Sequence, residues 1–332
     1  MRSDRDADLD PLSPYNRMTS AAFTVDLASY GPERCAARAT PLAESRDYCR
    51  QLASTHYENF HVASALLPRS LRPHFHAVYA YCRWADDLAD EIHDRARSLD
   101  LLRWWEDELR ACYAGEARHP VFVALRESIA EFSIPIEPFA DLLVAFRRDQ
   151  QVERYETSDD VLDYCRYSAN PVGRLVLYLA RSFDDARAGL SDSICTGLQL
   201  ANFCQDVASD FDRGRIYLPQ ETCRRFRYEA ADFVGRAYNE CFCNLMTVEV
   251  DRAEGYLRAG LPLVAQMPDG LRGDIWLFAQ GGLAILDCIR RARYDVWRHR
   301  PKISRLGKVR LLCGALSRNF LRAPRPRPLR GA

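Results

Sequence analysis

The chain has 332 residues, of which 48% are hydrophobic, and it carries 46 basic and 46 acidic residues. So many apolar residues can build a large core without disulfide bonds. The zero formal net charge gives nucleic acid no overall attraction, so we expect no nucleic-acid partner and a local basis for any electrostatic function.

The two ends of the chain differ in composition from the middle. Residues 1–42 contain four prolines among charged residues and have no sustained hydrophobic period, which predicts a mobile N-terminal tail. Residues 323–332 are basic and proline-rich, which predicts an unstructured tail with weak attraction for anionic lipid. The sequence has no apolar signal segment and no uncharged run of about 20 residues. We therefore expect a cytoplasmic protein, with peripheral contact to the inner face of the membrane as an open alternative.

Between these tails the hydrophobic pattern has the period of helices. Period-two alternation beside turn dipeptides, the sign of strands, is nearly absent. The amphipathic stretches in chain order are 44–56, 74–94, 99–114, 120–131, 137–150, 159–181, 191–211, 229–259 and 271–299. No composition break divides them, so the pattern predicts an all-α protein with a single domain over residues 43–322.

The segment YAYCRWADDLADE, residues 79–91, places acidic side chains on a helix that is apolar on most sides. At about 100° per residue, one narrow stripe of this helix holds Tyr79, Arg83, Asp86 and Asp90. Two carboxylates one turn apart repel each other, and burial makes the cost larger. A cation must offset this repulsion. Arg83 could do so as an ordinary ion pair with Asp86 or Asp87, and for an isolated motif that interpretation is favoured.

A second acidic segment, LQLANFCQDVASDFDRGRIYLP at residues 198–219, changes this interpretation. Asn202, Asp206 and Asp210 fall on successive turns beside an apolar face. Oxygen ligands suit hard divalent cations, and the absence of histidine disfavours zinc. Mg²⁺ takes one or two protein carboxylates and completes its shell with water and phosphate, which points to a diphosphate substrate.

Basic side chains lie near both segments and could contact such a diphosphate. Arg83 is on the first helix, and Arg213 and Arg215 follow the second. For Arg213, phosphate contact and solvation on a turn remain equally open, whereas phosphate contact is favoured for Arg215. The basic stretch 290–302 is interpreted as a solvated helix end, with contact to anionic lipid as the alternative.

Together the two acidic segments resemble the squalene/phytoene synthase family, over residues from about 47 to 310. The resemblance implies an isoprenoid-synthase helical bundle around a central apolar cavity and a prenyl diphosphate lipid as substrate. It implies two or three Mg²⁺ ions, bound with the substrate diphosphate. The metal ligands that it implies are Asp86, Asp90, Asn202, Asp206 and Asp210, and the four aspartates are also implied to be catalytic.

The resemblance extends to further positions. In the family, the segment matching HYENFHVASALLP, residues 56–68, covers the diphosphate, and Tyr164 matches a tyrosine implicated in proton handling and diphosphate contact. Asn170 and Pro171 replace the usual Ala-Gly, and Pro171 should interrupt its helix. The substrate-binding residues implied in this way are His56, Tyr57, Asn59, Phe60, Tyr79, Arg83, Asn170, Gln199, Gln205, Arg215 and Tyr217.

One departure from the family pattern is Gln205, where many relatives that condense two prenyl diphosphates have arginine. With HYENF and YSANPVGR, this makes the chain most like the hydroxysqualene synthase branch of hopanoid biosynthesis. The implied reaction is that of a carbon–oxygen lyase, which converts presqualene diphosphate and water to hydroxysqualene and diphosphate. A presqualene diphosphate synthase could hand over the substrate. Tyr164, Asn170 and Gln205 are open candidates for the group that admits the water.

Two other functions remain open at this point. One is the head-to-head condensation of two prenyl diphosphates by a prenyltransferase of the same family, giving presqualene diphosphate, dehydrosqualene, squalene or phytoene. The other is a non-catalytic assembly factor with the same fold, which the intact aspartates disfavour. No nicotinamide cofactor is expected, because no G-x-G-x-x-G segment follows a strand.

Overall fold

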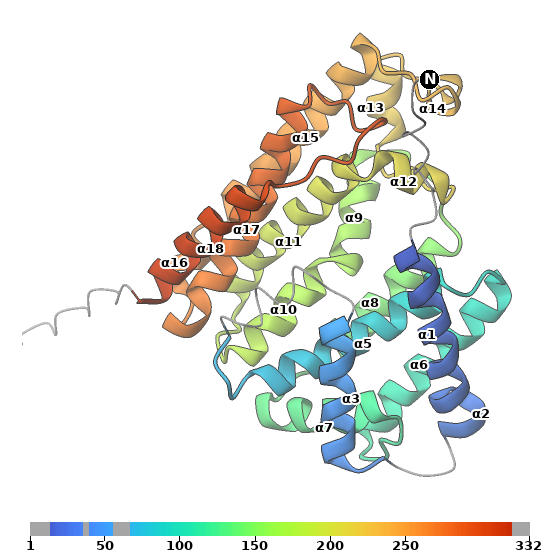
Figure 1. Cartoon of the computed structure of the whole chain (residues 1–332), viewed down its shortest axis with the longest axis vertical. Helices are drawn as coiled ribbons and strands as arrows, with labels where there is room; N and C mark the ends of the chain where they lie inside the picture. Colours follow the sequence, from blue (N-terminus) through green and yellow to red (C-terminus); the bar gives the residue numbers. More distant parts are fainter. Residues whose placement is uncertain (1–13, 36–39, 56–66, 321–332) are drawn as a thin grey trace, which may run out of the picture.

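The computed structural model describes residues 14–35, 40–55 and 67–320, which fold almost entirely into helices (Figure 1). Across these residues the only β-type pairing is a parallel bridge between Arg154 and Ile216. The all-α prediction is therefore confirmed. In chain order the helices are α1 (Pro14–Tyr30), α2 (Pro32–Cys35), α3 (Leu42–Thr55), α5 (Arg72–Asp90), α6 (Arg95–Tyr113), α7 (Pro120–Phe132), α8 (Glu137–Asp149), α9 (Ser158–Ser168), α10 (Asn170–Leu179), α11 (Asp185–Gln205), α12 (Val207–Asp212), α13 (Gln220–Arg225), α14 (Ala230–Val234), α15 (Glu240–Gly260), α16 (Leu263–Gln266), α17 (Asp269–Arg291) and α18 (Arg305–Phe320).

The helices from α1 to α8 supply most of one hydrophobic cluster, in the lower part of Figure 1. Its centre is aromatic. The rings of Trp84 and Trp105 stack with their centroids 5.2 Å apart, and the Tyr81 hydroxyl donates a 2.8 Å hydrogen bond to the carbonyl oxygen of Phe139. Because Trp84 and Tyr81 lie on α5, this cluster fixes the helix that carries the first acidic segment.

The helices from α9 onward supply most of a second cluster, in which α11 and α15 pack closely. Glycine permits this approach at two positions. A Cβ atom at Gly197 on α11 would lie 2.7 Å from the backbone nitrogen of Leu257, and one at Gly260 on α15 would lie 2.7 Å from the carbonyl oxygen of Leu190. Larger residues there would force the helices apart. The second acidic segment is therefore carried by a tightly packed helix.

The prediction of a mobile tail over residues 1–42 is wrong for the part of this stretch that the structure describes. It contains α1, in which Phe23 is only 6% exposed and packs edge-on against Trp84, with ring centroids 5.3 Å apart. Pro14 and Pro32 are the first residues of α1 and α2. Proline is favoured at the start of a helix because its missing N–H would have had no helical partner. These prolines begin helices and do not mark a disordered stretch.

Pro171 interrupts the helix expected over residues 159–181, as predicted. α9 ends at Ser168, and α10 begins at Asn170. Proline has no N–H to donate to the preceding turn, so the helix cannot run through this point without a break.

Two other helices are shorter than predicted. The stretch 229–259 divides into α14 and α15, and the stretch 271–299 loses its helix after Arg291, where α17 ends. Arg293 and Tyr294 have φ angles of 52° and 65°, in the left-handed region, which no α-helix of L-residues can continue through. The chain leaves α17 there and runs separately to α18.

Within the described ranges, no helix combines the length and apolar character needed to cross a bilayer. The cysteines whose side chains are described are all free thiols, so the fold is held by packing and polar contacts.

Asp274 on α17 generates a prediction about stability. Its carboxylate is buried, finds no hydrogen-bond partner among the other described residues, and has its pKa raised to about 7 by burial. A raised carboxyl pKa means that the folded state binds this proton more tightly than the unfolded state does. The contribution of protonated Asp274 to the free energy of unfolding is therefore fully present below about pH 4 and is lost as the pH rises to about 7. We expect Asp274→Asn to increase the free energy of unfolding by about 2–4 kcal/mol at pH 8, with little change at pH 4, in urea unfolding.

The exposed Asp269 on the same helix provides the control. Asp269→Asn should leave unchanged the difference between the free energies of unfolding at pH 4 and at pH 8. A stabilisation by Asp274→Asn that is equally large at pH 4 and pH 8 would contradict the assignment of this pH dependence to Asp274.

Candidate active site

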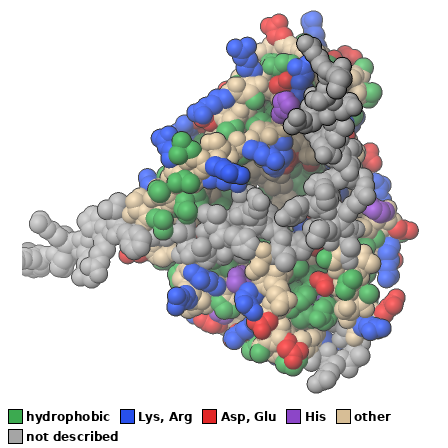
Figure 2. All heavy atoms as spheres, viewed as in Figure 1, with side chains coloured by type: hydrophobic (Ala, Val, Ile, Leu, Met, Phe, Trp, Pro, Cys, Tyr) green, Lys and Arg blue, Asp and Glu red, His purple; other side chains and the backbone are tan. Residues whose placement is uncertain are grey.

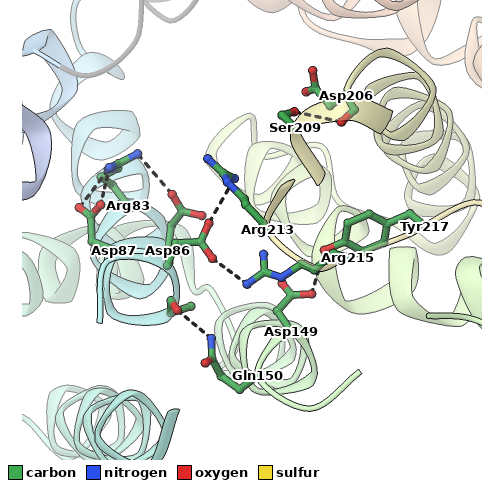
Figure 3. Close-up of polar contacts among 12 residues, drawn as sticks. Arg83, Asp86, Asp87, Asp149, Gln150, Asp206, Ser209, Arg213, Arg215 and Tyr217 are labelled. Carbon is green, nitrogen blue, oxygen red and sulfur yellow. Dashed lines mark hydrogen bonds and ion pairs between the residues drawn. The ribbon is translucent and has the colours of Figure 1, made fainter. Parts of the chain in front are cut away.

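Arginine side chains from the loop after the second acidic segment reach the carboxylates of the first (Figure 3). Arg215, in the loop after α12, donates from Nη2 to Oδ1 of Asp90 on α5 at 2.9 Å, across 125 positions of the sequence. Arg213 in the same loop places Nη1 3.6 Å from Oδ2 of Asp90. The sequence left two roles open for Arg213, contact with phosphate and solvation on a turn. In this structure it and Arg215 both pair with Asp90. We call Asp86, Asp87 and Asp90 the first acid row.

Within the first acid row, Arg83 forms the ion pairs that its spacing allows. It grips both carboxylate oxygens of Asp87, with Nε 3.0 Å from Oδ2, and its Nη1 lies 3.3 Å from Oδ2 of Asp86. Asp87, which is 3% exposed, lies off the predicted stripe but is the more buried acid. Burial raises the pKa of Asp87 to about 7, although Arg83 opposes this shift. Burial and the charge of Asp90 raise the pKa of Asp86 to about 6.

The second acid row, Asn202, Asp206 and Asp210, keeps its one-turn spacing although the helix breaks inside it. Asp206 joins α11 to α12 with φ −106° and ψ 14°. The hydrogen bonds from the Asp206 N–H to the Asn202 carbonyl and from the Asp210 N–H to the Asp206 carbonyl are both 2.9 Å. The expectation of one continuous helix to residue 211 is thus wrong, while the row itself is preserved. Burial, followed by repulsion from Asp206, raises the pKa of Asp210 to about 7.

Residues 292–304, here called the strap, connect α17 to α18 and reach the second acid row at Asp206. Arg300 grips both oxygens of Asp206, with Nη2 2.9 Å from Oδ2. The amide Nε2 of the buried Gln205 donates to the Pro301 carbonyl oxygen. The interpretation of 290–302 as a solvated helix end is therefore wrong for Arg300, which neutralises Asp206. Gln205, a candidate to admit water, is bonded to the strap in this structure.

Asp149, the last residue of α8, is a member of the site that the sequence did not predict. Its Oδ2 accepts a 2.8 Å hydrogen bond from the Tyr164 hydroxyl, and its Oδ1 accepts one of 3.1 Å from Tyr217. Burial raises its pKa to about 6, opposed by Arg215 and the two tyrosines. An acid at a helix C-terminus opposes the helix dipole, and this local anomaly was the one sequence signal for Asp149.

The loop that carries Arg215 and Tyr217 is fixed to the chain that follows α8. The Ile216 N–H donates to the Glu153 carbonyl at 2.8 Å, and the Gln220 N–H donates to the Tyr155 carbonyl at 3.0 Å. Gln150, directly after Asp149, donates from its side chain to the Ala89 carbonyl at 2.7 Å, near the end of α5. These bonds draw together the ends of α5, α8 and α12.

Other predicted residues lie elsewhere or are not described. His56, Tyr57, Asn59 and Phe60 fall outside the described residues. Tyr79 on α5 and Gln199 on α11 are half-buried. The buried Asn170 accepts from the Thr196 hydroxyl at 2.9 Å and lines a cavity of about 290 Å³ whose wall contains no residue of either acid row. The structure therefore does not bring Asn170 together with either acid row.

A second, much smaller cavity touches the second acid row. Its volume is about 10 Å³, room for about one water molecule. Its wall consists of Phe203, Val207, Asp210, Arg215, Ile216, Tyr217, Leu218 and Phe233. A prenyl chain does not fit in it, and the large central apolar cavity stays a prediction.

The acid rows offer the donor set that a hard cation prefers. In the parts of the chain that the structure describes, no three acidic, histidine or cysteine side chains converge closely enough to enclose an ion by themselves. The carboxylates instead meet arginines, and burial raises the pKa of three of them. The two rows offer only oxygen ligands and need additional positive charge. This fits Mg²⁺, which binds one or two protein carboxylates and completes its coordination shell with substrate phosphate.

Comparisons with known proteins agree with this geometry. Residues 42–307 match the family model of squalene/phytoene synthase. The chain is 44% identical to squalene synthase HpnC from Alicyclobacillus acidocaldarius, whose crystal structure matches with a TM-score of 0.74 over 77% of this chain and 97% of that one. The crystal structure of a dehydrosqualene synthase in complex with ligand is 27% identical, with a TM-score of 0.77 over 83% of this chain and 96% of that one. Phytoene synthase of Arthrospira platensis is 30% identical over 291 residues, 82% of this chain and 93% of its own length. Because the family model covers most of the chain, including both acid rows, the chain belongs to the squalene/phytoene synthase family.

Proposed function

We propose that this protein converts presqualene diphosphate and water to hydroxysqualene and diphosphate, with Mg²⁺ as cofactor. The observation that carries the proposal is that Arg213 and Arg215 pair with Asp90 of the first row and also act electrostatically on Asp210 of the second, in a chain 44% identical to the squalene synthase HpnC of Alicyclobacillus acidocaldarius. Gln205, which stands where many condensing relatives have arginine, supports the finer assignment, although Arg300 supplies a positive charge at Asp206.

The residues of the two rows would divide the work of releasing the diphosphate. Asp86, Asp90, Asn202, Asp206 and Asp210 would hold Mg²⁺, whose chemistry is to neutralise the charge that develops on the departing diphosphate. Arg83, Arg213, Arg215 and Arg300 now neutralise the carboxylates. With Mg²⁺ bound at the carboxylates, these guanidinium groups would be available to the diphosphate oxygens.

The pair of Tyr164 and Asp149 is the best candidate for handling the proton of the attacking water. Asn170 bonds to Thr196, and Gln205 bonds to the strap, whereas Tyr164 donates to a carboxylate. As the water oxygen bonds to the carbocation, one of its protons would pass to the Tyr164 hydroxyl, whose own proton moves to Asp149. The ring faces of Tyr164, Tyr217 and Phe203 lie together there, and aromatic faces stabilise cations.

Replacement of Asp206 tests the metal site. We expect Asp206→Asn to lower diphosphate release at least about 100-fold, because the second row loses a charge that a metal ion needs. Diphosphate release from presqualene diphosphate is measured with and without added Mg²⁺, together with the far-ultraviolet circular dichroism. EDTA should stop turnover by the parent protein, and Mg²⁺ should restore it.

Asp212→Asn provides a matched control, because Asp212 is the last residue of α12, the short helix that follows Asp206, but is exposed and pairs with Arg236. This variant should keep nearly full activity. Retained turnover in a folded Asp206→Asn protein would refute the metal assignment.

Replacement of Asp149 tests the proton path. We expect Asp149→Asn to lower kcat by about 100-fold or more while changing KM little, because the amide keeps a hydrogen bond to the tyrosines but is not a proton acceptor at neutral pH. Tyr164→Phe should have a similar effect, and Tyr217→Phe a smaller one. Steady-state kinetics on presqualene diphosphate measure all three. A loss confined to KM would assign Asp149 to substrate binding instead.

Labelled water separates the proposed reaction from the condensation reactions of the family. With presqualene diphosphate in water enriched in heavy oxygen, mass spectrometry should find one labelled oxygen atom in the lipid product. Farnesyl and geranylgeranyl diphosphate should give no condensation product, and NADPH should change nothing, because alcohol formation requires no hydride donor. Squalene that appears only with NADPH, or phytoene from geranylgeranyl diphosphate, would favour the prenyltransferase alternative.

The non-catalytic alternative is weakened by the cost of the site itself. A scaffold gains nothing from buried carboxylates such as Asp87 and Asp210, whose charge is expensive to desolvate. A scaffold would show no Mg²⁺-dependent binding of inorganic diphosphate in calorimetry.

For the enzyme, we expect a presqualene diphosphate synthase as the partner that supplies the substrate. The expected location is the cytoplasm, beside the inner face of the membrane.

A further inference from the structure

Helix α18 presents an apolar stripe to the outside of the molecule. Leu306 is 71% exposed, Val309 55% and Leu316 37%, and Cys313 between them is also exposed. At about 100° per residue these four side chains fall within an arc of about 80°. Single exposed apolar residues are ordinary, but four on one stripe of one helix form a surface that could bind a partner.

The opposite side of α18 is the one that packs on the rest of the protein. Ala315 is fully buried, and Gly314 lies so close to Trp276 on α17 that a Cβ atom would come within 2.4 Å of the indole ring. The guanidinium of Arg318 covers the same ring at 4.0 Å from its centroid. α18 is therefore held in place by α17, and the outer stripe is not needed for that packing.

Basic residues border the outer stripe. Arg305 lies next to it on one side and Arg310 on the other, and Lys308 is also exposed. None of the three forms an ion pair with a described carboxylate, and α18 contains no acidic residue. In Figure 2, hydrophobic side chains lie beside Lys and Arg on the left of the molecule, in the region where Figure 1 draws α18. The sequence that follows, 321–332, adds four arginines and no acid.

We propose that the outer stripe of α18 docks on an anionic membrane surface. Leu306, Val309 and Leu316 would enter the boundary between headgroups and acyl chains, while Arg305 and Arg310 pair with lipid phosphates. A second copy of the chain is a poorer occupant, because a symmetric contact would bring arginines against arginines. The stripe also contains only four side chains, whereas a stable interface has about 20–30 residues on each side.

The docking helix is directly connected to the candidate active site. Arg305 follows the strap, in which Arg300 contacts Asp206 and Pro301 contacts Gln205. A protein held to lipid through α18 would thus have the segment that pairs with Asp206 close to the membrane surface. This inference concerns where the protein sits and does not depend on which reaction it performs.

Vesicle flotation of the full chain tests the proposal without any substrate. We expect binding to vesicles of phosphatidylcholine and phosphatidylglycerol in a 7:3 ratio and much weaker binding to phosphatidylcholine alone, with binding that falls as salt is raised. Leu306→Ser with Val309→Ser should lower the partition coefficient about tenfold or more. Arg305→Gln and Arg310→Gln should each lower it about fivefold.

Val234→Ser is the matched control, since Val234 is an exposed valine on α14, remote in sequence from the stripe. It should bind vesicles as the parent does, and all variants should keep the parent's melting temperature and its activity on detergent-dispersed substrate. Equal binding by the stripe variants, or no binding by the parent protein, would overturn the proposal. A parent dimer in sedimentation velocity that Leu306→Ser dissociates would assign the stripe to a second copy. Lipid binding by a catalytically inactive parent would count against the proposed reaction and not against the docking surface.

Discussion

Arg215 is the cation on which the site depends, because two acidic helix ends converge on it. α5 ends at Asp90 and α8 ends at Asp149, and both helices therefore place a carboxylate where the helix dipole is already negative. Arg215 bonds directly to Asp90, and its charge also lowers the pKa of Asp149. Without a guanidinium at this point the ends of α5 and α8 would repel each other, and the two helix groups would lose a connection between them.

The same arrangement explains why the positive charge of the site comes from arginine. Asp86, Asp87 and Asp210 are buried enough for their pKa values to rise, so a lasting counter-charge must itself tolerate partial burial. Arginine stays protonated under these conditions and can grip both oxygens of a carboxylate, as Arg83 does. Its planar fork fits phosphate equally well. Groups that stabilise the fold in the absence of substrate are thus suited to bind a diphosphate when it arrives.

The sequence predicted what depends on local periodicity and missed what depends on distant contacts. Both acid rows follow from the spacing of residues along one helix, and this spacing survives even the break at Asp206. Pro171 interrupts its helix for an equally local reason. Asp149 and Arg300 act through partners far away in the sequence, and no helical pattern encodes those pairings. Pro14 shows a further limit of sequence-based prediction, because proline can either end or begin a helix. Here it begins α1, and this helix is held to the rest of the protein by the burial of Phe23, which the sequence pattern did not indicate.

The charge balance at Asp206 joins the chemistry of the site to the surface of the protein. Where the resemblance implies an arginine in many relatives that condense two prenyl diphosphates, this chain has the neutral Gln205, and Arg300 from the strap pairs with Asp206. The Gln205 amide bonds to the Pro301 carbonyl, next to Arg300, and so helps to hold the strap beside Asp206. Asp206 is consequently neutralised by a segment that leads directly into α18. Contact of α18 with lipid would therefore take place close to Arg300, whose guanidinium group pairs with Asp206.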